Sequence, residues 1–301
     1  AAVAAGFALA VVEPSMSGIG GRLQALYHEA SGKVGGVDAS TQVPMHYKPQ
    51  EEKYAYGYET IGIPGVVAGL LKLHGHHGSL PLQTVMEPAI RYAEEGYQIL
   101  PLEAKRQQSA QTIFEQFEGT KTHFLNSDGQ AFQAGDLVIQ KTLAYTLKQI
   151  AAKGKAGFYE GEIAEKMVED IQANGGILTL EDLKNYEALH AEVLEGSFQG
   201  TDVYALNLPS YGAITIQILQ IMDQLPPPAT EDADINLIWI FPQGQSLFDS
   251  SPEPVHVNLA ANKVNTSYIN KLIAEKPTIL AINYTTPWAI DEIYSENKPN
   301  I

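Results

Sequence analysis

The sequence predicts a mixed α/β fold of the α+β kind, and three observations support this. Short stretches of alternating apolar and polar residues lie near both ends of the chain, at Leu23–His28, Lys33–Asp38 and 191–208. Between them, apolar residues recur at helical spacing over segments that glycines close. Hydrophobic residues make up 45% of the 301 residues, which is enough to supply a full core.

The first predicted helix, Ala1–Val12, is rich in alanine, valine and leucine on nearly all sides. A helix that is apolar on nearly all sides is expected to be buried. Because a buried helix with nothing in front of it is unusual, we expect that residues are missing upstream. The helix should end near Glu13, because Pro14 disfavours helical geometry at the residue before it.

A tight turn is expected over Ser17–Gly21. Gly18, Gly20 and Gly21 are interpreted as residues that serve this turn, since glycine permits positive φ. The two strands that follow should be joined by a turn containing Gly32 and pair antiparallel. We expect this pair to lie beside the strands near 192–206, with helices packed on the sheet.

The middle of the chain predicts a series of helices. They are expected over Pro64–Gly75, 79–99, Leu102–Phe117, Gln140–Lys153 and Tyr159–Ala173, with Gly154 and Gly175 closing the last two. Thr179 and Asp182 have the spacing of a capping box for a further short helix. A helix over 209–225 is ended by three prolines, and beyond it the pattern is unclear.

Composition excludes several functions. A net charge of -16 argues against nucleic-acid binding, which needs basic patches. The absence of cysteine removes disulfides, thiolate nucleophiles and cysteine metal sites. The sequence "HGHHG" at 74–78 is interpreted as a solvated helix end. A metal site is the alternative, and it is disfavoured because one helix end cannot aim all three histidines at one ion.

Several stretches carry a family resemblance. In order along the chain they are "AAVAAGFALAVVEPSMSGIGG", "IGIPGVVAGL", "GSLPLQTVMEPAIRYAEEGYQI", "KAGFYEGEIAEKMVEDIQANGGILTLEDLKNYEA", "PSYGAITIQILQIMD" and "PEPVHVNLAANKVNTSYINKLIAE". Together they resemble the large subunit of the gamma-glutamyltransferase family of N-terminal-nucleophile hydrolases. The resemblance implies that residues 1–275 are the large-subunit part of an αββα sandwich and that 276–301 are a tail around the processing site.

The resemblance also implies an activity. Members of this family transfer an acyl group from glutathione or a related γ-glutamyl or acyl amide to water or an amine, through an acyl-threonine intermediate. The nucleophile is the threonine that begins the small subunit, and its own amine is the base. The implied partners are therefore that small subunit and a small-molecule amide, with no metal or organic cofactor.

The tail sequence "NYTTPW" is similar to the family's processing site, which makes Thr285 the candidate nucleophile. Pro287 stands where the family has histidine, so a chance match is the alternative.

The substrate loop departs from the family pattern. In the stretch "VDASTQVP", counting back from Pro44 places Ser40 where the family has the arginine that holds the substrate's α-carboxylate. Ser40, Thr41 and Gln42 are the candidate substrate-binding residues, and a merely polar strand exit is the alternative. Serine cannot replace a bidentate cation, so we expect poor use of glutathione and better use of amides whose acyl part lacks that carboxylate.

Two other interpretations stay open. The chain could be an inactive homologue that keeps the fold as a binding or scaffold protein, or a truncated gene product. Its longest apolar run is too short to span a bilayer and lacks the charged start of a signal peptide. The sequence therefore does not indicate whether the protein is located in the periplasm, outside the cell or in the cytoplasm.

Overall fold

The computed structural model describes residues 1–48, 56–224, 236–240 and 278–282. The chain forms two compact units: unit 1 comprises Ala1–Pro49, Gly57–Leu194 and Leu206–Tyr211, and unit 2 comprises Gln50–Tyr56, Glu195–Ala205 and Gly212–Ile301. Unit 1 holds the N-terminal hairpin and the predicted helices except the one over 209–225, whose helical residues belong to unit 2.

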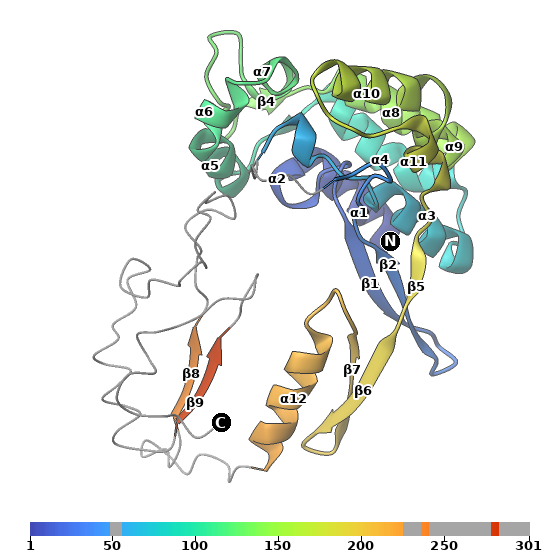
Figure 1. The fold of residues 1–301 in the computed structure, drawn as a ribbon, viewed down its shortest axis with the longest axis vertical. Helices are drawn as coiled ribbons and strands as arrows, with labels where there is room; N and C mark the ends of the chain where they lie inside the picture. Colours follow the sequence, from blue (N-terminus) through green and yellow to red (C-terminus); the bar gives the residue numbers. More distant parts are fainter. Residues whose placement is uncertain (49–55, 225–235, 241–277, 283–301) are drawn as a thin grey trace. The chain divides into compact units, whose positions relative to one another are not determined.

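The sheet of unit 1 is built on the predicted hairpin (Figure 1). Strands β1 (Leu23–His28) and β2 (Val34–Ala39) pair antiparallel, which confirms their predicted pairing. Gly32, with φ +89°, lies in the turn between them, as expected. The third strand is β5 (Leu189–Ala191), which pairs antiparallel with β2.

The expectation that strands near 192–206 lie directly beside the hairpin is wrong. The chain leaves the ladder at Glu192, whose carbonyl accepts a hydrogen bond from the Asn207 N–H at 3.0 Å. Strands β6 (Val193–Phe198) and β7 (Thr201–Leu206) instead pair with each other in a separate two-stranded sheet.

Helix α1 (Ala2–Val12) ends at Glu13 as predicted, and the short helix α2 (Pro14–Ser17) follows at once. The prediction that α1 is buried all round is wrong for the described residues. Phe7, Ala10 and Val11 are buried, whereas Leu9 is 42% exposed. Helix α1 contacts α2, α3 and α4, and it is covered in part.

Helix α3 (Val66–His77) packs on β1 and β2 through glycine. A Cβ at Gly69 would lie 2.6 Å from Leu23 Cδ2 and 2.7 Å from Ala39 Cβ. A Cβ at Gly65, one turn earlier, would lie 1.9 Å from the Ala39 carbonyl oxygen. All three distances are shorter than van der Waals contact, so this approach requires glycine at both positions.

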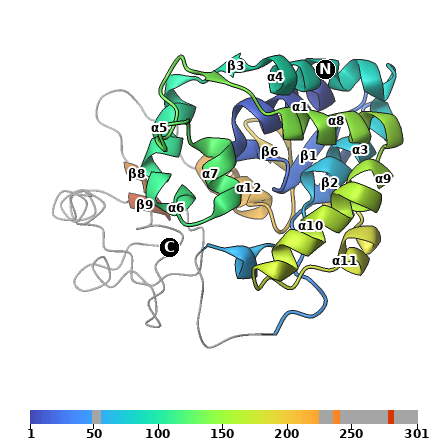
Figure 2. The same cartoon turned by 90° about the horizontal axis from the view of Figure 1, so that it is seen from above.

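The remaining helices of unit 1 pack in succession. Figure 2 shows α1, α4 (Leu82–Glu95) and α8 (Lys141–Lys153) side by side, and α8 in turn contacts α9 (Ala156–Tyr159). Helix α10 (Gly161–Ala173) packs on α9 and on α11 (Leu180–Asn185). The predicted capping box of α11 is present, with Thr179 and Asp182 as its two members.

One predicted helix is divided in the structure, and another begins two residues later than predicted. The segment 102–117 forms α5 (Pro101–Ser109) and α6 (Gln111–Phe114), which are separated at Ala110. The Ser109 hydroxyl, next to this break, donates to the Arg106 carbonyl at 2.7 Å. The helix predicted over 159–173 corresponds to α10, and the extended residue Glu160, with φ -136°, separates it from α9.

The remaining elements are short. They are the 3₁₀ helix η1 (Tyr58–Thr60), helix α7 (Glu118–Phe124), strands β3 (Tyr97–Gln98) and β4 (Leu137–Val138), and in unit 2 helix α12 (Gly212–Asp223) and the parallel strands β8 (Asn236–Ile240) and β9 (Thr278–Ile282). Strand β3 begins where the predicted helix 79–99 ends early, at Gly96 with φ +98°. No helix in the described ranges has the length and apolar character that crossing a bilayer requires.

The contact of Gly65 with the sheet gives the first prediction. Gly65→Ala would drive a methyl group into the Ala39 carbonyl, and overpacking of this kind costs about 1–3 kcal/mol or more. The matched control is Gly20→Ala, because a Cβ at Gly20 meets no atom within 4 Å. Urea unfolding should show the loss for Gly65→Ala and a change below about 0.5 kcal/mol for Gly20→Ala. Equal effects of the two substitutions would contradict the packing described.

Candidate functional site

The glycine turn and the candidate substrate-binding residues lie at one end of the β1–β2 ladder. Leu23 pairs with Ala39, so the glycine turn that precedes β1 and the loop that follows β2 leave the sheet at the same end. Antiparallel pairing thus brings Gly18–Gly21 close to Ser40–Gln42, although about twenty residues separate them in sequence. We call this region the sheet end.

The N-terminus of α3 joins the two segments. The Gly21 carbonyl accepts hydrogen bonds from the Gly65 N–H at 2.8 Å and from the Val66 N–H at 3.1 Å. Gly65 in turn lies against the Ala39 carbonyl on the other strand. The turn, the helix start and the substrate loop are therefore held as one structure.

Two stacked tyrosines support this arrangement from the helices. The rings of Tyr159 and Tyr186 are nearly parallel, with centroids 5.6 Å apart. The Tyr159 hydroxyl donates to the Pro64 carbonyl at 2.8 Å, and the Tyr186 hydroxyl donates to the Ser40 carbonyl at 2.8 Å. Burial, with a smaller effect of the Asp38 charge, raises the pKa of Tyr186 to about 12. Tyr186 is thus a neutral donor that positions the loop.

The candidate substrate-binding residues differ in how they are held. The Ser40 hydroxyl and N–H both donate to Asp38 Oδ1, at 2.6 and 2.9 Å, so this hydroxyl is already engaged. Gln42 exchanges backbone hydrogen bonds with Ile63, and its side chain and that of Thr41 are exposed. The loop therefore has a fixed backbone and presents two polar side chains outward.

The end of the loop is attached to α11. Pro44 is buried, and the Met45 N–H donates to Asp182 Oδ1 at 2.8 Å. The Thr179 N–H and hydroxyl donate to Asp182 Oδ2, at 2.9 and 2.6 Å. Burial raises the pKa of the Asp182 carboxyl, but the hydrogen bonds from Thr179 and Met45 together lower it by a larger amount. The pKa of Asp182 is therefore below its ordinary value.

The glycine turn is present, but the reason predicted for its glycines is wrong. Gly18 has a φ of -54°, and neither Gly20 nor Gly21 is among the glycines with positive φ. At Gly18 the requirement for glycine is steric instead, because a Cβ there would lie 2.8 Å from the Pro14 carbonyl oxygen. The turn follows α2 so closely that a side chain at Gly18 has no room.

A cavity of about 670 Å³ lies over this turn. Its lining includes Gly18–Gly21, Ser15 and Met16 from the corner, His123 and Phe124 at the end of α7, and Gln140 before α8. Gln140 is buried, and its amide donates to the Val11 carbonyl and the Tyr97 hydroxyl, each at 3.3 Å. The cavity is large enough for a small organic molecule.

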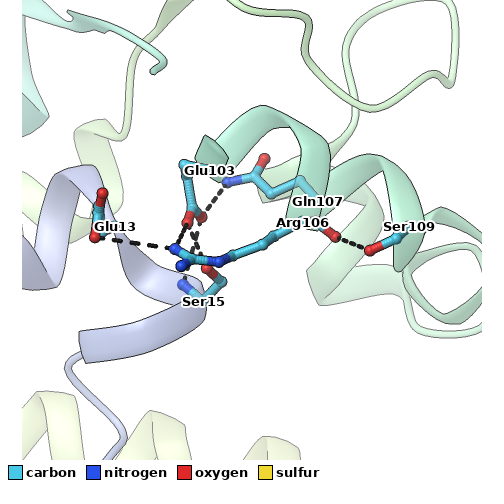
Figure 3. A network of polar contacts seen from close by, with 6 residues as sticks. All are labelled: Glu13, Ser15, Glu103, Arg106, Gln107 and Ser109. Atoms are coloured by element: carbon cyan, nitrogen blue, oxygen red, sulfur yellow. Dashed lines mark hydrogen bonds and ion pairs between the residues drawn. The ribbon is translucent and has the colours of Figure 1, made fainter. Parts of the chain in front are cut away.

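A buried carboxylate fixes the corner between α1 and the turn, and sequence analysis missed it. Glu103 on α5 is 0% exposed and accepts hydrogen bonds from the Ser15 hydroxyl and from Gln107 Nε2, the latter at 2.9 Å (Figure 3). Arg106 Nη1 lies 3.8 Å from Glu103 and 4.0 Å from Glu13. In the sequence, Glu103 is one charged residue of a polar helix, and nothing there marks it as buried.

The predicted metal alternative receives no support from the described residues, among which no three His, Cys, Asp or Glu side chains are placed to hold an ion. His74 and His77 lie in the last turn of α3, where the histidine-rich sequence was expected to end a helix. The candidate nucleophile Thr285 lies outside the described residues, so its role stays a prediction.

Comparison with known proteins shows the family. The family described as Gamma-glutamyltranspeptidase matches residues 1–241. The chain is 32% identical to the glutathione hydrolase proenzyme of Escherichia coli K12 over 235 residues, which are 74% of this chain and 40% of that protein. The chain therefore belongs to the gamma-glutamyltranspeptidase family, as the sequence motifs indicated.

Solved structures show the same fold. The Helicobacter pylori gamma-glutamyltranspeptidase matches with a TM-score of 0.73 and 36% identity, over 75% of this chain and 68% of that chain. A cephalosporin acylase from Bacillus halodurans matches with a TM-score of 0.70 and 28% identity, over 76% of this chain and 45% of that one. The predicted α+β fold is thereby confirmed. The chain spans about 40% of the length of the curated relatives that it matches.

The Asp182 contacts give the second prediction. Because the folded-state pKa is lowered, this carboxylate stabilises the fold above the unfolded pKa of about 4, and the contribution is lost as the pH falls through the folded pKa. Asp182→Asn places an amide donor against N–H groups. We expect this substitution to lower the free energy of unfolding by about 1–3 kcal/mol at neutral pH. The difference from wild type should shrink as the solution is acidified below that unfolded pKa.

Urea unfolding at neutral and at acidic pH measures this difference. The matched control is Asp128→Asn, since Asp128 is exposed in the turn that begins at Asn126 and its replacement should leave stability unchanged. A difference between Asp182→Asn and wild type that does not vary with pH would reject the role of the charge.

Proposed function

We propose that this chain is the large-subunit part of an enzyme that transfers acyl groups from amides, with glutathione or a related γ-glutamyl or acyl amide as donor. The observation that carries the proposal is the sheet end, where family motifs that lie far apart in sequence form one rigid structure around Gly65. Relatives named glutathione hydrolase and a structural neighbour named cephalosporin acylase support both kinds of donor.

The proposed reaction proceeds in two steps. A threonine hydroxyl attacks the amide carbonyl carbon, the C–N bond breaks, and the amine leaves with the proton that the hydroxyl gave up. Water or a second amine then attacks the acyl-threonine ester and releases the threonine. We propose Thr285 as this nucleophile and its freed α-amine as the proton acceptor, with the small subunit as the partner that supplies the oxyanion donors.

A second candidate, a homologue that binds ligands without catalysis, is favoured by two substitutions. Ser40 stands where the resemblance predicts arginine, and Pro287 stands where it predicts histidine. A processed, full-length protein that binds acyl amides without cleaving them would support this candidate over the enzyme.

The proposal predicts that residues 1–301 alone are catalytically silent. The chain spans about 40% of its relatives' length, and the resemblance places the oxyanion donors in the remainder. Loss of one such donor alone typically costs about 10²–10³-fold in rate. The measurement is release of the chromogenic amine from a γ-glutamyl anilide by the purified chain. Turnover that Thr285→Ala abolishes would overturn this prediction and establish Thr285 as a working nucleophile.

A further inference from the structure

The cavity over the glycine turn has no role in the proposed function. Its volume of about 670 Å³ lies within the range that is typical of ligand sites. Its lining comes from α1, α2, the glycine turn, the end of α7 and the start of α8, all of which belong to unit 1. Ser40, Thr41 and Gln42 are not among the lining residues, so the candidate substrate-binding residues form no part of its wall.

The charge of this lining is unusual for so acidic a chain. Among the described lining residues there is no Asp, Glu, Lys or Arg, and His123 is the one titratable side chain. A smaller cavity of about 470 Å³, bordered by η1, α7 and α10, differs because Glu118, Lys121 and Asp170 line it. In the cavity over the turn, an ionised ligand group would lose hydration without gaining an opposite charge. The lining therefore favours an uncharged ligand.

A buried amide side chain gives the cavity a polar end. Gln140 is 8% exposed, and its backbone is fixed because its N–H donates to the Ala93 carbonyl at 2.8 Å. The side-chain Nε2 donates to the Val11 carbonyl and to the Tyr97 hydroxyl, each at 3.3 Å. Since the Val11 carbonyl can only accept, it determines which end of the Gln140 amide is the nitrogen.

The oxygen of the same amide has no partner. Gln140 Oε1 accepts no hydrogen bond from the described residues, and it is not one of their unpartnered polar atoms that are fully covered. Because Gln140 lines the cavity, this oxygen is reachable from it. A buried acceptor without a donor is unfavourable, and a ligand N–H would satisfy it.

A hydroxyl and an apolar wall complete the site. The Thr142 hydroxyl makes no hydrogen bond with the described residues, so it can donate to a ligand carbonyl. Ile19 and Leu143 pack against the core, and the Phe124 ring is stacked on Phe114 with centroids 5.1 Å apart. Ile19, Leu143 and Phe124 all line the cavity, and we call them the apolar wall.

We propose that this cavity binds a small uncharged amide that carries an aromatic or aliphatic group. The ligand N–H donates to Gln140 Oε1, its carbonyl accepts from the Thr142 hydroxyl, and its hydrocarbon group lies against the apolar wall. Such a ligand differs from a γ-glutamyl donor, which carries an ammonium and a carboxylate. The inference concerns binding alone and does not rest on the proposed function.

The test uses three probes that share one benzene ring. N-methylbenzamide has the N–H and the uncharged carbonyl, methyl benzoate replaces the N–H by oxygen, and benzoate is charged. Binding of each probe to the purified 301-residue chain is measured by ligand-observed NMR titration. We expect N-methylbenzamide to bind about tenfold more tightly than either of the others, because only this probe satisfies Gln140 Oε1 without burying a charge.

Substitutions at Thr142 test the location of the site. Thr142 is exposed in the first turn of α8, so this position accepts a larger side chain, and the ring in Thr142→Trp would occupy the cavity. We expect Thr142→Trp to abolish binding of N-methylbenzamide and Thr142→Val to weaken it about threefold to tenfold. The matched control is Thr112→Trp, which should keep wild-type binding because Thr112 is exposed on α6 and lines neither of the two cavities.

Three results would overturn the assignment: no saturable binding of N-methylbenzamide, equal binding of the amide and the ester, or binding that Thr142→Trp leaves unchanged. Tighter binding of benzoate than of the amide would also overturn it, and would indicate that the start of α8 selects an anion instead. None of these measurements involves turnover, so their outcome is separate from whether the full-length protein cleaves acyl amides.

Discussion

The close approach of Gly65 to the Ala39 carbonyl is the constraint on which the sheet end depends. A side chain at position 65 would overlap the backbone of β2, so the start of α3 contacts the sheet directly. Tyr159 and Tyr186 hold the two sides of this contact through Pro64 and Ser40. An offset aromatic pair adds only about 0.5–1.5 kcal/mol, but its hydrogen bonds satisfy carbonyls that the contact buries.

This constraint gives the candidate site its rigid part. The glycine turn is fixed by the hydrogen bonds to Gly21, and the substrate loop is fixed at Ser40 and again at Met45. The sheet end is therefore a preformed surface, and preformed surfaces lower the conformational cost of binding. At that surface, Asp38 accepts hydrogen bonds from both the hydroxyl and the N–H of Ser40.

The buried Glu103 has a comparable role on the other side of the turn. A fully buried carboxylate is stabilising only where hydrogen bonds and opposite charge compensate its lost hydration. Ser15, Gln107 and Arg106 provide these contacts, and through Ser15 they tie α5 to the corner that ends in the glycine turn. The turn is thus supported by α3 from one side and by α5 from the other.

The sequence by itself determined the family, the α+β class, the antiparallel hairpin, the capping box at Thr179 and the helix start at Pro64–Gly65, because these features rest on local patterns. Local patterns did not predict the third strand at Leu189–Ala191 or the break at Ala110. Only the tertiary structure placed Glu103 beside Ser15, since burial and such contacts depend on residues far away in the chain.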